Sequence, residues 1–412
     1  MGGMATLTKQ KPFARLDTHS TPTSRTGAPS GSSWKYLPLG LGGLAAGGSV
    51  EAEELELERA DPGLTHLLLT TRNAAKGKIE TVIYPENSST LLGLAFGSAG
   101  ALPSYFTVEQ YLNADLGASF DAGTDTGRIL SGCLADGFSF SVDRKQLGSL
   151  RLSLDVYVNA DASTESAAPS PTWPAQDPYT GKRLLVDLDL ANNSQTLNGW
   201  SGDYTSMRSM SINFQNGIET DLHRADESSD ALDGTWTQAY PGTPRASIQF
   251  KLVADAAEHL DLLRLNAGLR KMAFRIAAYG ANPSGNTTCT TSLTAGSSVT
   301  VAVAATTGFA VDDYVLLWQP TANKFAVAKV TTVNSGVSLV VDTLDVTMNG
   351  GTETIKVRNT AFELKVSDAR IRSATPPTLE GNVYVVDVTA EAIVGPSNSA
   401  AITLKAYNDN NT

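Results

Sequence analysis

Residues 128–158 read RILSGCLADGFSFSVDRKQLGSLRLSLDVYV, and residues 362–393 read FELKVSDARIRSATPPTLEGNVYVVDVTAEAI. Each stretch alternates apolar and polar residues on both sides of a polar turn, which is the pattern of a β-hairpin with one buried face. In each stretch an aspartate precedes the turn and a glycine follows it at nearly the same spacing. The sequence therefore predicts the same hairpin twice in one chain.

The segments that precede the two hairpins also repeat in the same order. Residues 76–97 begin with a β-branched strand pattern, which a Leu-rich helical segment ending in glycine follows. Residues 245–268 repeat this plan, with Asp255 as the expected cap of the second Leu-rich helix. The chain is therefore predicted to be a tandem duplication of two lobes, each built from strands, a strand–helix–strand unit and a hairpin.

Two regions lie outside this repeat. Residues 284–357 hold short strand patterns joined by polar turns, so they predict a small β-domain inserted into a loop of the second lobe, projecting outward and dispensable for assembly. Residues 1–34 are rich in Pro, Ser, Thr and Gly and predict an extended arm without its own core.

The expected fold class is mainly β, with two tandem β-sandwich or barrel lobes, each with a short helix, plus the small inserted β-domain. The predicted boundaries are 1–34 for the arm, 35–162 for lobe 1, 163–182 for a Pro-rich linker, 183–283 and 358–412 for the two parts of lobe 2, and 284–357 for the insert.

Composition and charge limit the class of protein. Of the 412 residues 41% are hydrophobic and 18% are charged, which favours a β-rich globular chain over a disordered one. The formal net charge of −11 argues against binding nucleic acid through the average electrostatic field. Two cysteines, Cys133 and Cys289, are too few for a disulfide framework. Residues 1–30 lack a secretory signal, so we expect the protein to be made in a cytoplasm. Residues 36–48 are too few and too Gly-rich to span a bilayer, so we expect the chain to bind no membrane.

Signatures of catalysis are missing from the sequence. It holds no GxSxG, no HExxH, no pair of CxxC motifs and no DxDxDG calcium loop. The segment YTGK at 179–182 ends like a phosphate loop, but Gln176 stands where the first glycine should be. We therefore expect no enzyme, no cofactor and no metal site.

Acidic residues alternate with leucines on early strands of both lobes; they are Glu54, Glu56 and Glu58 in lobe 1 and Asp187 and Asp189 in lobe 2. Paired carboxylates can serve glycoside hydrolysis, but a solvated sheet face is the simpler interpretation because aromatic residues make up only 7% of the chain. Basic residues dominate the arm; they are Lys9, Lys11, Arg15 and Arg25.

Three stretches resemble the tail tube proteins of long-tailed bacteriophages. They are GKIETVIYPENSSTLLGLAFG (77–97), GCLADGFSFSVDRKQLGSLRLSLDVYV (132–158) and MRSMSINFQNGIETD (207–221), in the order in which that family has them. The resemblance covers residues 34–283 and 358–412, and the insert departs from the simplest pattern of the family.

The resemblance implies a structural subunit of a phage tail. Tube subunits close into rings that stack into a hollow conduit for genome delivery, and three two-lobed chains would supply six lobes, giving homotrimeric, pseudo-hexameric rings. The implied partners are further copies of the chain, the tape measure and tail-end proteins, and double-stranded DNA that passes without specific binding. The implied location is the virion tail, assembled in the host cytoplasm. On this reading the five acids would line the lumen, and the basic arm would reach the acidic surface of the next ring.

The alternative is a binding module, such as a β-domain adhesin or a capsid decoration protein. Its support is the insert, which is similar to generic partner-binding β-domains and carries two bulky aromatic candidates, Trp318 and Phe325. Rings or tubes of the purified protein in electron micrographs would favour the tube, and isolated particles would favour the alternative.

Overall fold

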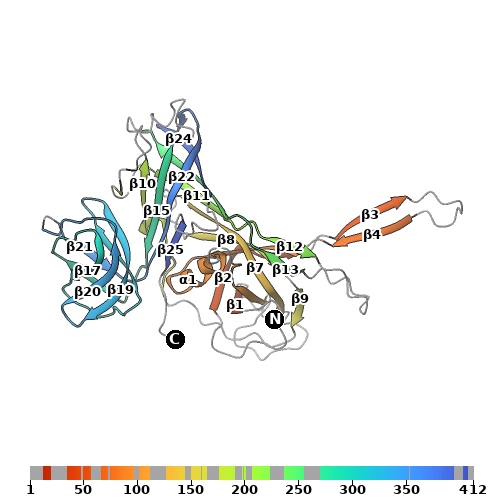
Figure 1. Cartoon of the computed structure of the whole chain (residues 1–412), viewed down its shortest axis with the longest axis horizontal. Helices are drawn as coiled ribbons and strands as arrows, with labels where there is room; N and C mark the ends of the chain where they lie inside the picture. The colour runs from red at the N-terminus through yellow and green to blue at the C-terminus, as the bar shows by residue number, and fades with distance from the viewer. Residues whose placement is uncertain are drawn as a thin grey trace, which may run out of the picture.

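The computed structural model describes the chain except for residues 1–12, 20–34, 48–49, 57–65, 73–74, 97–101, 112–126, 144–149, 159, 165–175, 191–196, 198, 201–206, 223–235, 255–269, 352, 394–401 and 407–412. The described residues form a mainly β fold, as predicted, with a 15-stranded sheet, a six-stranded sheet and two two-stranded hairpins (Figure 1). Every strand pairing recorded for these sheets is antiparallel.

Lobe 1 is a ring of strands. Its strands are β1 (Phe13–His19), β2 (Lys35–Gly47), β5 (Ala75–Val82), β6 (Tyr105–Tyr111), β7 (Gly127–Asp143), β8 (Arg151–Val158) and β9 (Ala160–Thr164). They pair in the order β7-β6-β1-β2-β5-β8, and β8 returns to β7, so the ring closes. Closure follows from the length of β7, whose first part pairs with β6 and β9 while its second part pairs with β8.

Lobe 2 uses the same pairing order without closing. Its strands are β10 (Leu184–Leu190), β11 (Met207–Gln215), β14 (Arg245–Val253), β15 (Lys271–Tyr279), β22 (Ala361–Ala374), β23 (Thr378–Glu380), β24 (Val383–Ile393) and β25 (Ile402–Ala406). The order β10-β15-β22-β24-β14-β11 matches β1-β6-β7-β8-β5-β2 of lobe 1, and β25 pairs with the start of β22 as β9 does with β7. This shared order is what a tandem duplication would give.

A two-stranded hairpin also occupies the same place in each lobe. The strands are β3 (Val50–Glu56) and β4 (His66–Arg72) in lobe 1, and β12 (Glu219–Leu222) and β13 (Trp236–Tyr240) in lobe 2. Figure 1 shows the β3–β4 hairpin reaching away from the sheet on the right.

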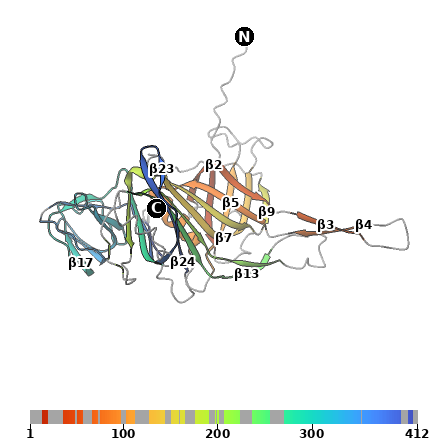
Figure 2. The same ribbon diagram turned by 90° about the horizontal axis from the view of Figure 1, so that it is seen from above.

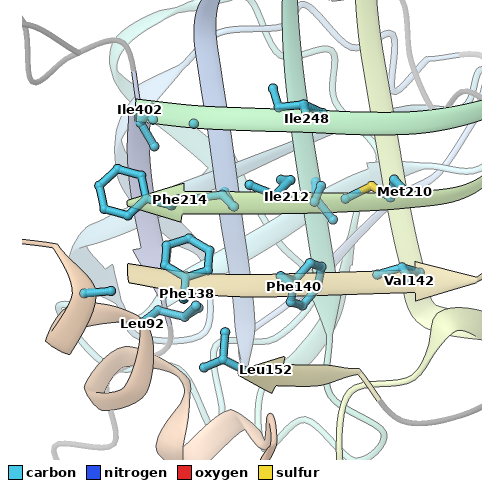
Figure 3. Packing of buried hydrophobic residues seen from close by; sticks show 14 of the residues in the cluster. Leu92, Phe138, Phe140, Val142, Leu152, Met210, Ile212, Phe214, Ile248 and Ile402 are labelled. Atoms are coloured by element: carbon cyan, nitrogen blue, oxygen red, sulfur yellow. The ribbon is translucent and has the colours of Figure 1, made fainter. Parts of the chain in front are cut away.

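The two lobes share one hydrophobic core because β7 of lobe 1 pairs with β11 of lobe 2. Phe138 and Phe140 of β7 lie on the same face as Ile212 and Phe214 of β11 (Figure 3). The rings of Phe138 and Phe214 stack with centroids 5.4 Å apart. Burial of aromatic rings on both sides of the junction stabilises it, so the lobes form one continuous sheet rather than two linked domains.

Helix α1 (Pro85–Ala95) covers one end of this core, as the Leu-rich pattern predicts. Pro85 opens the helix, where its missing N–H costs nothing, and the Asn87 side chain accepts a hydrogen bond from the Tyr84 N–H at 2.8 Å. Leu91 and Leu92 are buried in this core, and Figure 3 shows Leu92 beside Phe138 of β7. The corresponding helix expected in lobe 2 lies outside the described residues.

The six-stranded sheet occupies the region in which the sequence predicts the insert. Its strands are β16 (Asn286–Cys289), β17 (Gly296–Ala302), β18 (Tyr314–Gln319), β19 (Lys324–Asn334), β20 (Ser338–Leu344) and β21 (Ile355–Arg358), in the order β16-β21-β18-β19-β20-β17. The sheet encloses a hydrophobic cluster of its own and lies on the left of Figure 1. It enters the chain between β15 and β22, the place that residues 112–126 hold between β6 and β7 in lobe 1.

Two segments differ from expectation. Residues 13–19 of the predicted arm form β1, which pairs with β2 and β6 inside the sheet. Figure 2 shows this part of the sheet, with β2, β5 and β7 labelled. The end of the predicted linker is also part of the fold, because the Tyr179 side chain is fully buried and its backbone bonds to Ile83 and Leu150. Both segments join the fold through contacts with residues far away in the sequence, and no local sequence pattern predicts those contacts.

Candidate functional site

The face of the main sheet opposite the core is polar across both lobes. Strands β5, β8, β7, β11, β14, β24 and β22 lie side by side, and their residues stand in directly opposed rows. One row consists of Val82, Arg151, Ser141, Ser211, Gln249, Thr389 and Ser373; the next consists of Glu80, Ser153, Ser139, Asn213, Ser247, Glu391 and Arg370. We call these two rows the polar sheet face.

The polar sheet face follows from strand alternation. Each of its residues stands one position from a core residue, so Ser141 lies between buried Phe140 and Val142, and Ser211 lies between buried Met210 and Ile212. Because the rows run across the β7–β11 junction, the face belongs to neither lobe alone.

A concavity of about 770 Å³ lies on this face where the lobes meet. Side chains from both lobes line it, among them Ser141 and Arg151 of lobe 1 and Ser211, Gln249 and Thr389 of lobe 2. Its side chains on the polar rows are mostly short hydroxyls and amides, which offer hydrogen bonds without a strong field.

Several cations on or beside the face are paired with carboxylates. Lys251 binds Glu380 and also lies 3.7 Å from Asp387, measured between Nζ and Oδ1. Hydrogen bonding to Glu380 raises the pKa of Lys251, so the amine stays charged and paired. An Nη1 atom of Arg208 lies 3.2 Å from the Glu380 carboxylate. Such half-exposed pairs add little stability, but they neutralise positive charge that would otherwise attract phosphate.

A second pair lies farther along the same face. The Nε atom of Arg372 donates to Glu391 at 2.8 Å. At the edge of the face, burial raises the pKa of Asp155, and the neighbouring Lys78 opposes that shift while Asp136 adds to it. Within the described part of the chain, no group of three or more His, Cys, Asp or Glu residues could hold a metal ion.

The acids predicted to line a lumen do not meet on this face. Glu54 and Glu56 lie on β3, in the hairpin that stands off the main sheet (Figure 1), and Glu58 lies outside the described residues. Asp187 and Asp189 of β10 are buried, with 0% and 6% of their surface exposed. The expectation that these two carboxylates lie on a solvated sheet face is therefore wrong.

Partners from elsewhere in the chain explain the burial of both aspartates. The Asp187 carboxylate pairs with Arg275 at 2.9 Å beneath the insert, and the Asp189 carboxylate accepts a hydrogen bond from the Gly199 N–H at 2.7 Å. The alternation did place both carboxylates on the non-core side of β10, but it could not predict which segments cover that side.

Of the four basic residues of the arm, Arg15 lies in β1, opposite Tyr36 of β2 and Glu109 of β6. Lys9, Lys11 and Arg25 lie outside the described residues. Arg15 therefore occupies a strand position between β2 and β6 rather than a place in an extended arm.

The strand patterns of the sequence carry a signal for the polar sheet face. The segments FSFSV (138–142), SMSINF (209–214) and ASIQF (246–250) all place Ser, Asn or Gln at the alternate positions. Ser, Asn and Gln are residues that usually lie at the surface, so their alternation with apolar residues indicates strands with one polar face.

No protein-family model and no curated protein matches this sequence. Among the described residues, none of the helices has the length and apolar character needed to cross a membrane.

Proposed function

We propose that this chain is the structural subunit of a bacteriophage tail tube, polymerising as stacked trimeric, pseudo-hexameric rings into a conduit for genome delivery. The observation that carries the proposal is the edge-to-edge joining of two lobes with matching strand order through β7 and β11. A joint of that kind can be repeated between copies, because the same strands recur in each lobe.

The internal joint suggests how one copy meets the next. In lobe 2, β22 corresponds to β7, and its last residues pair with β24 as β7 pairs with β8. Beyond Arg370, which faces Lys271, β22 has no further β15 partner among the described residues, and Arg372 and Ser373 are exposed. The strand that corresponds to β11 is β2, so β2 of a second copy is the proposed occupant of that edge.

Repeating this head-to-tail contact gives a heterologous interface, which forms a closed ring when the rotation per copy divides a full turn. With two lobes per chain, three copies give six lobes. The polar sheet face would then continue around the ring as the wall of its bore. That wall would suit a conduit because Arg208, Lys251 and Arg372 are paired with carboxylates, which reduces the positive charge available to hold DNA phosphates.

Cryo-electron microscopy of the assembled protein tests the proposal. We expect rings with threefold symmetry and six similar lobes, and we expect cysteines at Ser373 and at single positions along 40–46 to form disulfides between copies. Covalent trimers on oxidation would support the proposed edge. Rings of six full chains, or particles that remain single at high concentration, would contradict the proposal.

The alternative, an adhesin or capsid decoration protein, relied on exposed aromatic residues of the insert. Phe325 is fully buried, and the ring of Trp318 lies 5.9 Å from the ring of Tyr279 in lobe 2. Both aromatic residues contribute to the contact between the insert and lobe 2, so neither favours a carbohydrate-stacking surface.

A further inference from the structure

We propose that the insert is held on lobe 2 in one orientation by a cluster of six charged side chains centred on the fully buried Arg275, and is therefore a fixed part of the subunit rather than a tethered module. The cluster consists of Arg275, Asp187, Glu363, Lys365 and Lys405 of lobe 2 and Asp345 of the insert. This inference concerns the joint between two parts of one chain and does not depend on the proposed tube.

Arg275 of β15 is the centre of the cluster and has no exposed surface. One guanidinium nitrogen, Nη2, lies 2.9 Å from the Asp187 carboxylate of the same lobe. The other, Nη1, lies 3.1 Å from Oδ1 of Asp345, and Oδ2 of Asp345 lies 2.9 Å from Nζ of Lys365. A single carboxylate of the insert therefore binds two cations of lobe 2.

Glu363 and Lys405 extend the cluster. Glu363 is only 1% exposed, and its carboxylate lies 3.5 Å from Nζ of Lys405 and 3.9 Å from Nη1 of Arg275. Lys405 also donates a hydrogen bond to the Val327 carbonyl of the insert. Three cations thus face three carboxylates, and Asp345 is the carboxylate that the insert contributes.

Apolar contacts surround these charges. Leu316, Phe325 and Val327 of the insert form a buried cluster with Leu185, Ala277 and Ala361 of lobe 2. The Arg275 guanidinium lies 4.4 Å above the Phe325 ring and 4.5 Å from the Trp200 ring. This apolar surround shields the Arg275 guanidinium from water, which strengthens its ion pair with the buried Asp187.

The two chain segments that connect the insert to lobe 2 are also tied together. The Asn359 side chain accepts from the Gly285 N–H at 2.9 Å and donates to Ser284 Oγ and to the Gly308 carbonyl, both at 2.8 Å. Next along the chain, the Thr360 carbonyl accepts from the buried Tyr179 hydroxyl at 3.0 Å. The two connecting segments are therefore hydrogen-bonded to each other and to the rest of the chain, which limits the movement of the insert relative to lobe 2.

Spin-label distance measurements on the full chain test the proposal. Labels at Ser335→Cys in the insert and Asn382→Cys in lobe 2 use exposed positions, whereas both native cysteines are buried. We expect a single narrow distance distribution. Asp345→Asn combined with Lys365→Met should raise the displaced population by about tenfold or more, because the fully buried Arg275 then loses its carboxylate partner on the insert.

Asp312→Asn is the matched control, since Asp312 pairs with Lys329 inside the insert, 2.7 Å away, and touches no residue of the cluster. Hydrogen exchange of β17 to β20 shows whether the insert stays folded in each variant. A broad distribution in the unmodified chain, or equal behaviour of the cluster variant and the control while the insert stays folded, would overturn the proposal. If the insert unfolds in the cluster variant, the milder Lys365→Met alone should still broaden the distribution, and its failure to do so would also overturn it.

Discussion

At the scale of single residues, the joint between the lobes depends on the absence of a side chain at Gly137. A Cβ atom there would lie 2.1 Å from the Phe214 carbonyl oxygen, a backbone atom that cannot move without shifting β11. We expect Gly137→Ala to destabilise the chain by about 1–3 kcal/mol, as overpacking typically does, measured by denaturant unfolding. The hydrogen exchange of β7 and β11 should rise with it.

Gly93 is the matched control for this substitution. It lies exposed in α1, and a Cβ atom there would meet nothing within 4 Å. Gly93→Ala should stabilise the chain by about 0.5–1 kcal/mol, because alanine loses less backbone entropy than glycine in a helix. Equal effects of the two substitutions would mean that the β7–β11 contact is looser than its geometry implies.

At the scale of elements, the sequence predicted what local alternation determines. The hairpin of β7 and β8 and the leucine face of α1 both lie where their patterns place them. Strand positions and burial that depend on contacts with distant segments could not be predicted from the sequence. β1 has a short and irregular pattern and gains its place from β2 and β6, and Asp187 is buried by an insert whose contacting residue Asp345 lies far along the chain.

The docking of the insert on lobe 2 should resist mild acid. Burial opposes ionisation of Asp345, but the charges of Arg275 and Lys365 outweigh it and hold its pKa below the ordinary value of 3.8. A carboxylate with a lowered pKa contributes stability above its ordinary pKa and loses it as the pH falls through the lowered value. Burial raises the pKa of Glu363, so that residue contributes most below its ordinary pKa of 4.5 and loses its contribution as the pH rises through the raised value.

Acidification from neutral pH should therefore protonate Glu363 first, which removes a buried charge, and should weaken docking only once Asp345 titrates. We expect the spin-label distance between insert and lobe 2 to stay constant down to about pH 4, near the ordinary carboxyl range, and to broaden only below it. Broadening between pH 7 and pH 5 would contradict this order of titration.

At the scale of the whole molecule, the net charge of −11 is less informative than where the charges lie. Glu54 and Glu56 lie in a projecting hairpin and Asp187 and Asp189 are buried, whereas the face shared by the two lobes carries mostly Ser, Thr, Asn and Gln. Strand register alone brings those residues together, and it could not be read from either lobe separately.

If the polar sheet face lines a bore, new positive charge there should hold DNA. We expect assembled Asn213→Lys/Gln249→Lys protein to retain double-stranded DNA, since both positions are exposed on that face. A plot of the logarithm of the binding constant against the logarithm of the salt concentration should become steeper by about 0.9 for each phosphate that the new lysines neutralise.

The control variant is Ser297→Lys/Thr300→Lys, which adds the same charge on β17 of the insert. Nuclease treatment separates the two cases, because DNA inside a bore is protected while DNA on an outer surface is digested. Protection confined to the first variant would support the wall assignment, and equal digestion of DNA on both variants would show that the polar sheet face lies open to solvent.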